Sequence, residues 1–184
     1  MPPALLLIDI QNDYFPGGNL EVDQAETVAG QAAQLLQAFR ELDLPRIHIQ
    51  HLSTRPGATF FLAGTPGVEI HADVRPGAGE PVFQKNFPNS FRDTGLDDYL
   101  HEQAIDQLVI CGMMSQMCID ATTRAAFDKG YKCMVAHDAC AARALSFNGA
   151  AIPASQVHGA FMAALGVVHA EILPTEQIIA SLPA

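Results

Sequence analysis

Short apolar runs alternate along this chain with longer segments in which apolar residues recur every three or four positions. The first run, residues 4–8, reads Ala-Leu-Leu-Leu-Ile, and residues 25–39 then follow the helical spacing. An unbroken apolar run of this length is typical of a strand buried on both faces, whereas the longer recurrence is typical of an amphipathic helix. The alternation predicts βαβ units, and therefore a parallel sheet with helices on both of its faces.

The same criteria place the remaining elements. Further strands are predicted at residues 46–52, 81–84, 107–111, 131–136 and 167–172, and further helices at residues 94–103, 118–129 and 157–165. Asp23 and Glu26 have the spacing of a capping box at the start of the first helix, and Ser115 is expected to be the N-cap of the helix that begins near Cys118. The expected fold class is α/β, with three α/β/α layers and a mostly parallel six-stranded sheet.

One long segment, residues 53–81, interrupts the pattern. It is rich in glycine and proline and shows no clear period. Long connections without secondary structure of their own are often functional in compact domains. This segment is therefore a candidate part of a binding site.

Composition narrows the classes of function. The chain has 184 residues, 49% of them hydrophobic, which suffices for one core, so we predict a single domain over residues 1–184. The formal net charge of -10 disfavours nucleic acid and anionic membranes as partners, because their phosphates would repel the surface. No apolar run reaches the roughly 18 residues of a membrane-spanning helix, and the N-terminus lacks the basic start of a signal peptide.

The cysteines indicate a reducing compartment. Cys111, Cys118, Cys133 and Cys140 form no CxxC pair and are too few for a disulfide scaffold. Free thiols are expected, which favours a cytoplasmic location. Cys111 and Cys133 lie inside predicted strands and should belong to the core, whereas Cys140 follows a predicted strand and is the one rival of Cys118 as a reactive thiol.

Three polar residues lie where predicted strands end or where the following helix begins. Asp9 follows the first strand, Lys85 follows the third, and Cys118 begins the helix after the fourth. Ligands of open parallel sheets bind at the carboxyl ends of the strands, so the three side chains should meet at one edge. A nucleophilic thiol needs a base to take its proton and a positive charge nearby. Taken singly, each residue also has an ordinary structural interpretation: a turn acid, a surface lysine and a core cysteine.

The sequences around these residues resemble, in order and spacing, the signature segments of the isochorismatase-like hydrolases. The matching segments read LLLIDIQNDYF, KNFPNSFRDTGL and VICGMMSQMCIDATTRAAFDKGY, within about residues 5–138. The resemblance implies a single α/β domain with a catalytic triad of Asp9, Lys85 and Cys118. It also implies a cis peptide bond between Met113 and Met114, and an oxyanion hole formed by the N–H groups of Met114 and Cys118.

The resemblance implies hydrolysis of a small amide through a thioester on Cys118, and assembly into a homo-oligomer. Vinyl ether cleavage of the isochorismatase type is an alternative, although family members that catalyse it can dispense with the thiol. A catalytically idle binding module of the same fold is another. A dinucleotide-binding or flavodoxin-like domain is disfavoured, because no glycine-rich phosphate loop follows the first strand.

No metal and no other cofactor is predicted. The metal-binding nicotinamidases of the family carry an Asp-x-His motif after the second strand, where this chain reads HIQHLSTRP, with His48 and His51 but no Asp. Together with His71 these histidines could suggest a zinc site, but a catalytic zinc site needs three protein ligands and one open position. His71 is expected to pack in its loop, and His158 to lie in the core or at an interface.

The expected substrate pocket is aromatic. Phe15, Phe60 and Phe87 flank the signature segments on loops and are predicted to contact the substrate. Gln11 is expected to hold the loop after the first strand and also to reach the substrate. The sequence does not identify the substrate itself.

Overall fold

The computed structural model describes residues 3–183, so the ends of the predicted domain (residues 1, 2 and 184) lie outside the described residues. Six strands form one parallel sheet in the order β3-β2-β1-β4-β5-β8. Their bounds are β1 Ala4–Ile8, β2 Arg46–His51, β3 Val82–Lys85, β4 Gln107–Met113, β5 Lys132–Ala141 and β8 Glu171–Leu173. The predicted α/β fold with a six-stranded sheet is confirmed.

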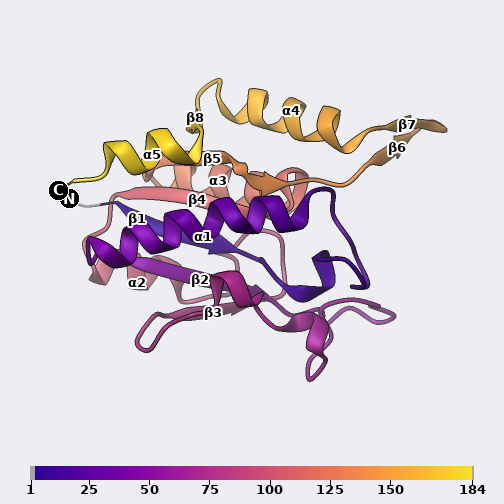
Figure 1. Ribbon diagram of the computed structural model, residues 1–184, viewed down its shortest axis with the longest axis horizontal. Coiled ribbons are helices and arrows are strands. Elements are labelled where there is room, and N and C mark those ends of the chain that lie inside the picture. The colour runs from indigo at the N-terminus through magenta and orange to yellow at the C-terminus, as the bar shows by residue number, and fades with distance from the viewer. Residues whose placement is uncertain (1–2, 184) are drawn as a thin grey trace.

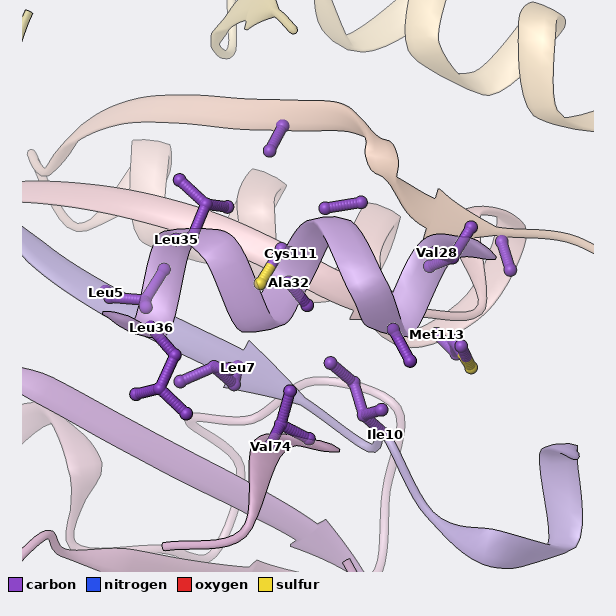
Figure 2. Packing of buried hydrophobic residues seen from close by; sticks show 14 of the residues in the cluster. Leu5, Leu7, Ile10, Val28, Ala32, Leu35, Leu36, Val74, Cys111 and Met113 are labelled. Carbon is purple, nitrogen blue, oxygen red and sulfur yellow. The ribbon is translucent and has the colours of Figure 1, made fainter. Parts of the chain in front are cut away.

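Helices cover both faces of this sheet (Figure 1). On one face lie α1 (Ala25–Glu41) and α5 (Thr175–Ser181), and on the other lie α2 (Leu96–Glu102), α3 (Asp120–Asp128) and α4 (Ala154–Leu165). Successive side chains of a strand point to opposite faces, so the apolar run of β1 divides between two cores. Leu5 and Leu7 pack under α1 (Figure 2), while Leu6 and Ile8 pack on the opposite side.

The C-terminal third differs most from expectation. β5 continues past residue 136 to Ala141, after a shift of its register with β4, and therefore includes Cys140. β8 begins only at Glu171, because Val167 and Val168 are exposed and precede it in a turn. The antiparallel hairpin of β6 (Leu145–Phe147) and β7 (Ala150–Ile152), and helix α5, were not predicted. The hairpin projects from the body of the molecule (Figure 1).

Both predicted helix caps are wrong. The N-cap of α1 is Gln24, with a φ of 56°, and no side chain caps it, so Asp23 and Glu26 form no capping box. Ser115 is not an N-cap either. It is the first residue of a π-helical turn, Ser115–Ile119, and its hydroxyl donates to the carbonyl of Ala141 at 3.1 Å.

The connection between β2 and β3 contains two 3₁₀ turns, Pro66–Val68 and Ala72–Val74, and is fastened to the loop after β1. Three consecutive side chains of that loop make the attachment. Gln11 donates to the carbonyl groups of His51 and Val68, Asn12 donates to that of Pro66, and the carboxylate of Asp13 accepts from the N–H of Phe61. Buried backbone groups need such partners, so this loop fixes the conformation of the long connection.

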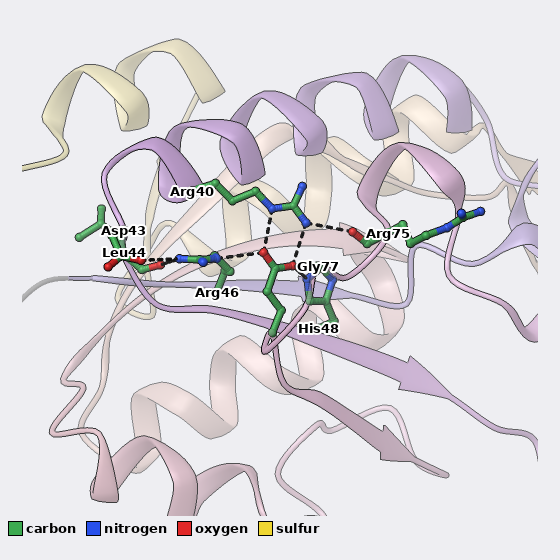
Figure 3. Close-up of polar contacts among 8 residues, drawn as sticks. Arg40, Asp43, Leu44, Arg46, His48, Arg75 and Gly77 are labelled. Atoms are coloured by element: carbon green, nitrogen blue, oxygen red, sulfur yellow. Dashed lines mark hydrogen bonds and ion pairs between the residues drawn. The ribbon is translucent and has the colours of Figure 1, made fainter.

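The far end of the same connection is held by Glu80 (Figure 3). Its side chain is nearly buried and accepts hydrogen bonds from Arg40 on α1 and Arg46 on β2, while His48 lies 2.9 Å away. Gly77 donates its backbone N–H to the same carboxylate. The guanidinium groups lower the pKa of Glu80, and burial lowers that of His48.

Among residues 3–183, every helix is too short or too polar to cross a lipid bilayer.

Candidate active site

Three strands deliver the predicted catalytic residues to one edge of the sheet. Asp9 follows the last residue of β1, Lys85 is the last residue of β3, and Cys118 lies in the π-helical turn after β4. His51, the last residue of β2, pairs in register with Lys85 and therefore lies between β1 and β3 at the same edge. The structure thus brings Asp9, Lys85 and Cys118 together, with His51 as a fourth member.

The ammonium group of Lys85 is the centre of this cluster. Its Nζ lies 2.6 Å from Oδ2 of Asp9, 3.1 Å from Nδ1 of His51 and 3.3 Å from Sγ of Cys118. An ammonium has three N–H groups and no acceptor, so it donates one hydrogen bond to each of the three partners. Nδ1 of His51 must therefore be the unprotonated ring nitrogen, which leaves the proton of the neutral ring on Nε2.

The cluster is almost completely shielded from solvent. Asp9, Lys85 and Cys118 are 0%, 1% and 5% exposed. Burial by itself lowers the pKa of Lys85, but the negative charge and hydrogen bond of Asp9, helped by Cys118, outweigh it and raise that pKa. The pKa of Cys118 is raised by burial and further by Asp9, with Lys85 opposing. At rest the lysine is charged and the thiol keeps its proton.

A carboxylate oxygen is available to take that proton. Oδ2 of Asp9 is bound by Lys85, whereas Oδ1 is buried and has no hydrogen-bond partner among the described residues. Acceptor atoms of Asp9, His51 and Cys118 all lie within 4.8 Å of one another. An unpartnered buried oxygen beside a protonated thiol is the arrangement that general base catalysis requires.

The same atoms do not suit a metal ion. Asp9, His51 and Cys118 offer the donor types of a zinc site, but the Lys85 ammonium lies within hydrogen-bond distance of all three. A second cation among these ligands would be repelled by the ammonium that they already bind. The other two histidines that the sequence suggested as zinc ligands lie elsewhere: His48 binds Glu80, and His71 stacks on Phe15 with ring centroids 3.7 Å apart.

A cavity of about 200 Å³ opens over Cys118. Its wall is mainly apolar and aromatic, with a few polar side chains. The lining residues are Tyr14, Leu20, His51, Thr54, Arg55, Phe60, Phe61, Asn86, Phe87, Pro88, Met114, Met117 and Cys118. A small apolar cavity with a few convergent polar groups and a nucleophile is typical of a small-molecule site.

The predicted pocket residues divide into two groups. Phe60 and Phe87 line the cavity, as the sequence led us to expect. Gln11 and Phe15 do not: the amide N–H groups of Gln11 are used by backbone carbonyls of the long connection, and Phe15 packs on His71. Tyr14 was not predicted, although it lies in the Asp9 segment. Burial raises the pKa of Tyr14, so its hydroxyl keeps a proton that it can donate.

The backbone around Cys118 agrees with the expected geometry. The peptide bond between Met113 and Met114 is cis. Met114 and Cys118, the residues predicted to supply the oxyanion hole, both line the cavity. Cys118 lies in the turn that leads into α3, where backbone N–H groups and the helix dipole favour negative charge.

The remaining thiols and histidines lie away from this cavity. Cys111, Cys133 and Cys140 are buried inside strands, and burial raises the pKa of each. Cys140 is therefore a strand residue and does not follow a strand end. His158 on α4 is half-buried and lies 2.8 Å from the hydroxyl of Ser115.

Comparison with known proteins gives a consistent result. Residues 3–164 match the model of the Isochorismatase domain. The isochorismatase family protein YddQ of Bacillus subtilis is 49% identical over 179 residues, which are 97% of this chain and 99% of that protein. The nicotinamidase of Escherichia coli is 28% identical over 76% of this chain and 84% of its own length. The crystal structure of a proposed isochorismatase hydrolase from Oleispira antarctica superposes with a TM-score of 0.94 at 49% identity, covering 98% of this chain and 97% of the other.

Proposed function

Because the chain belongs to the isochorismatase family, we propose that it is a cysteine hydrolase that cleaves the C–N bond of a small amide. The observation that carries the proposal is the Lys85 ammonium, which binds both the Asp9 carboxylate and the Cys118 thiol in the wall of a cavity. A buried acid, ammonium and thiol have no need to meet for stability, since a buried ion pair contributes little to it. Their meeting beside a cavity supports a catalytic role.

In the first half of the reaction, Oδ1 of Asp9 takes the proton of the Cys118 thiol as the sulfur attacks the amide carbonyl carbon. The S–C bond forms, and the carbonyl oxygen becomes an oxyanion bound by the N–H groups of Met114 and Cys118. Asp9 then returns the proton to the amide nitrogen, the C–N bond breaks, and ammonia or an amine leaves. The enzyme is left as a thioester.

In the second half, water enters the vacated position. Asp9 removes a proton from the water as its oxygen attacks the thioester carbon, and the S–C bond breaks with return of the proton to sulfur. Lys85 remains charged throughout and stabilises whichever of Asp9 and Cys118 is negative. The reaction needs no cofactor, because the thiolate is itself the nucleophile.

The thiol also supports one reaction of the family over the other. Vinyl ether cleavage proceeds by protonation and addition of water, so it has no use for a sulfur nucleophile. In this chain Cys118 is present and in contact with Lys85. This contact supports amide cleavage over vinyl ether cleavage.

Two further features of the proposal rest on the whole chain. All four cysteines are free and buried, which suits the reducing cytoplasm. We also propose that the protein forms a homo-oligomer, for which the exposed Phe147 of the β6–β7 hairpin offers an apolar contact.

A screen of small amides, carbamates and ureas tests the function, with hydroxylamine present in half of the reactions. Hydroxylamine attacks thioesters, so a true substrate should yield ammonia in all reactions and a hydroxamate where hydroxylamine is present. A vinyl ether such as isochorismate serves as the competing substrate. Release of pyruvate from it, without ammonia from any amide, would replace our proposal by the isochorismatase reaction. No turnover of either kind would favour a binding module.

A further inference from the structure

The walls of the cavity over Cys118 carry an unequal distribution of charge. None of the described residues that line it is an aspartate or a glutamate, although the whole chain has 20 of these and only 10 lysines and arginines. One lining residue, Arg55, carries a positive charge. In this acidic protein, the lining of the cavity over Cys118 therefore contains a cation and no carboxylate.

The charge of Arg55 is not neutralised by the protein. The ion pairs within residues 3–183 do not include Arg55. By contrast, Lys85 lies beside the cavity floor and is balanced by Asp9 at 2.6 Å. The uncompensated charge of the cavity wall is thus the Arg55 guanidinium.

A second arginine lies near the same cavity. The guanidinium of Arg92 lies 3.5 Å from the ring centroid of Phe87, a lining residue. Arg92 also pairs with Asp93 at 3.7 Å, so its charge is partly balanced. Arg55 therefore remains the unpaired positive charge in the cavity wall, and it makes the local potential more positive than the average of this acidic surface.

We propose that the substrate is an anionic amide, with the scissile amide at one end and a carboxylate at the other that Arg55 binds. This inference rests on the amide hydrolysis proposed above and names its substrate class. A guanidinium offers a planar pair of N–H groups that matches a carboxylate, and the charge-assisted bonds are stronger than neutral ones. The aromatic wall of Phe60, Phe61 and Phe87 would enclose the short apolar segment that joins the two ends.

A pair of substrates of equal length tests the class directly. Succinamate and butyramide differ only in whether the end opposite the amide is a carboxylate or a methyl group. We expect the wild-type protein to hydrolyse succinamate with the higher kcat/KM. Arg55→Gln should lower kcat/KM for succinamate on the order of ten- to a hundredfold and lower that for butyramide much less, so that the preference for succinamate is lost. Arg75→Gln is the matched control, because Arg75 does not line the cavity and its side chain points away from the Glu80 cluster (Figure 3).

A second measurement does not depend on turnover. Iodoacetate and iodoacetamide alkylate the same thiol and differ in one negative charge. The ratio of their alkylation rates at Cys118, measured by peptide mapping, therefore reports the charge of the cavity. We expect the iodoacetate-to-iodoacetamide rate ratio at Cys118 to exceed the same ratio for the free thiol 2-mercaptoethanol, and to fall as the salt concentration is raised. The ratio should fall about tenfold in Arg55→Gln but not in Arg75→Gln.

The two measurements separate the two proposals. Equal hydrolysis of the two amides, or a labelling ratio that Arg55→Gln does not change, would overturn the anionic class while leaving amide hydrolysis intact. If neither amide is cleaved and the labelling ratio still depends on Arg55, anion binding stands and the hydrolysis proposal fails.

Discussion

The Lys85 ammonium has three N–H groups and three acceptors at hydrogen-bond distance, so its geometry is fully determined. This single residue orients the proposed base, the proposed nucleophile and the neighbouring imidazole. Burial lowers the His51 pKa to about 4, and the adjacent Lys85 charge contributes to the shift. His51 is therefore neutral over the range in which an ordinary histidine titrates.

From this arrangement we predict that catalysis survives chelation. Activity on the best amide should be unchanged after dialysis against EDTA, because the acceptor atoms a metal would need are bound by the Lys85 ammonium. The measurement is ammonia release before and after dialysis, and again after addition of zinc, manganese or iron. A loss that one metal restores would show that His51 is a ligand and that the nicotinamidase type of site is present.

The sequence predicts a polar residue of the site where that residue lies at the end of a strand or the start of a helix. Asp9, Lys85 and Cys118 end strands or begin a helix, and the topology of a parallel sheet brings such positions together. Tyr14 ends the short 3₁₀ turn Asn12–Tyr14, and Arg55 lies in the long connection, which Gln11, Asn12 and Asp13 fasten to the loop after β1. These hydrogen bonds join residues far apart in the sequence, so no local sequence pattern predicts them.

At the scale of elements, the contact between β1 and β4 sets the position of Asp9, the proposed base. Gly112 pairs with Ile8, the residue before Asp9, and has a φ of 128°. A Cβ at Gly112 would lie 2.0 Å from the carbonyl oxygen of Ile8. Only glycine permits this approach, so the strand that positions Asp9 depends on it.

Gly112→Ala should therefore lower both stability and activity. We expect a loss of about 2 to 4 kcal/mol in the free energy of unfolding, measured with denaturant, together with a lower kcat. Gly159→Ala is the control: Gly159 lies within α4 with nothing within 4 Å of the added Cβ, so that variant should be unchanged or more stable by up to about 1 kcal/mol. If Gly112→Ala unfolds at the same denaturant concentration as the wild type, this account of the β1–β4 contact is wrong.

A second element-level prediction concerns the attachment of the long connection by Glu80. Glu80→Gln should reduce the free energy of unfolding at pH 7 by about 1 to 3 kcal/mol, because Arg40 and Arg46 lose their charged acceptor. The folded pKa of Glu80 lies below its unfolded value, so its contribution is complete above the unfolded pKa and is lost as the pH falls toward the folded one.

The difference between wild type and Glu80→Gln should therefore shrink below a pH of about 4.5. Glu69→Gln is a control of equal charge at an exposed position of the same connection. A difference in stability that stays constant between pH 7 and pH 3 would show that the charge of Glu80 does not stabilise the fold.

For the whole molecule, the apolar pattern was sufficient for the parallel sheet and its two layers of helices, because each buried strand and each amphipathic helix is specified locally. It failed in the C-terminal third for identifiable reasons. Asn148 and Gly149 both have positive φ and form the turn of the β6–β7 hairpin, and the Asn-Gly pair is a hairpin signal that the apolar pattern does not contain. Val167 and Val168 have the β-branched side chains typical of a strand, but they are exposed and lie before β8.

The net charge of the whole molecule affects how an anionic substrate would approach the cavity. A net charge of -10 repels anions on average, so an anionic substrate needs a local positive region to reach the thiol. In our proposal, Arg55 in the cavity wall supplies that region. Rates on an anionic amide should therefore depend on salt more strongly than rates on a neutral one.

The central claim is that Cys118 is the nucleophile, and the most direct test compares Cys118→Ala with Cys140→Ala by ammonia release from the best amide. Both variants should fold, as judged by a melting temperature within a few degrees of the wild type. Cys118→Ala should release no ammonia above background, whereas Cys140→Ala should retain turnover, because Cys140 is a buried strand residue away from the cavity. Hydrolysis by Cys118→Ala at a rate near that of the wild type would contradict the account.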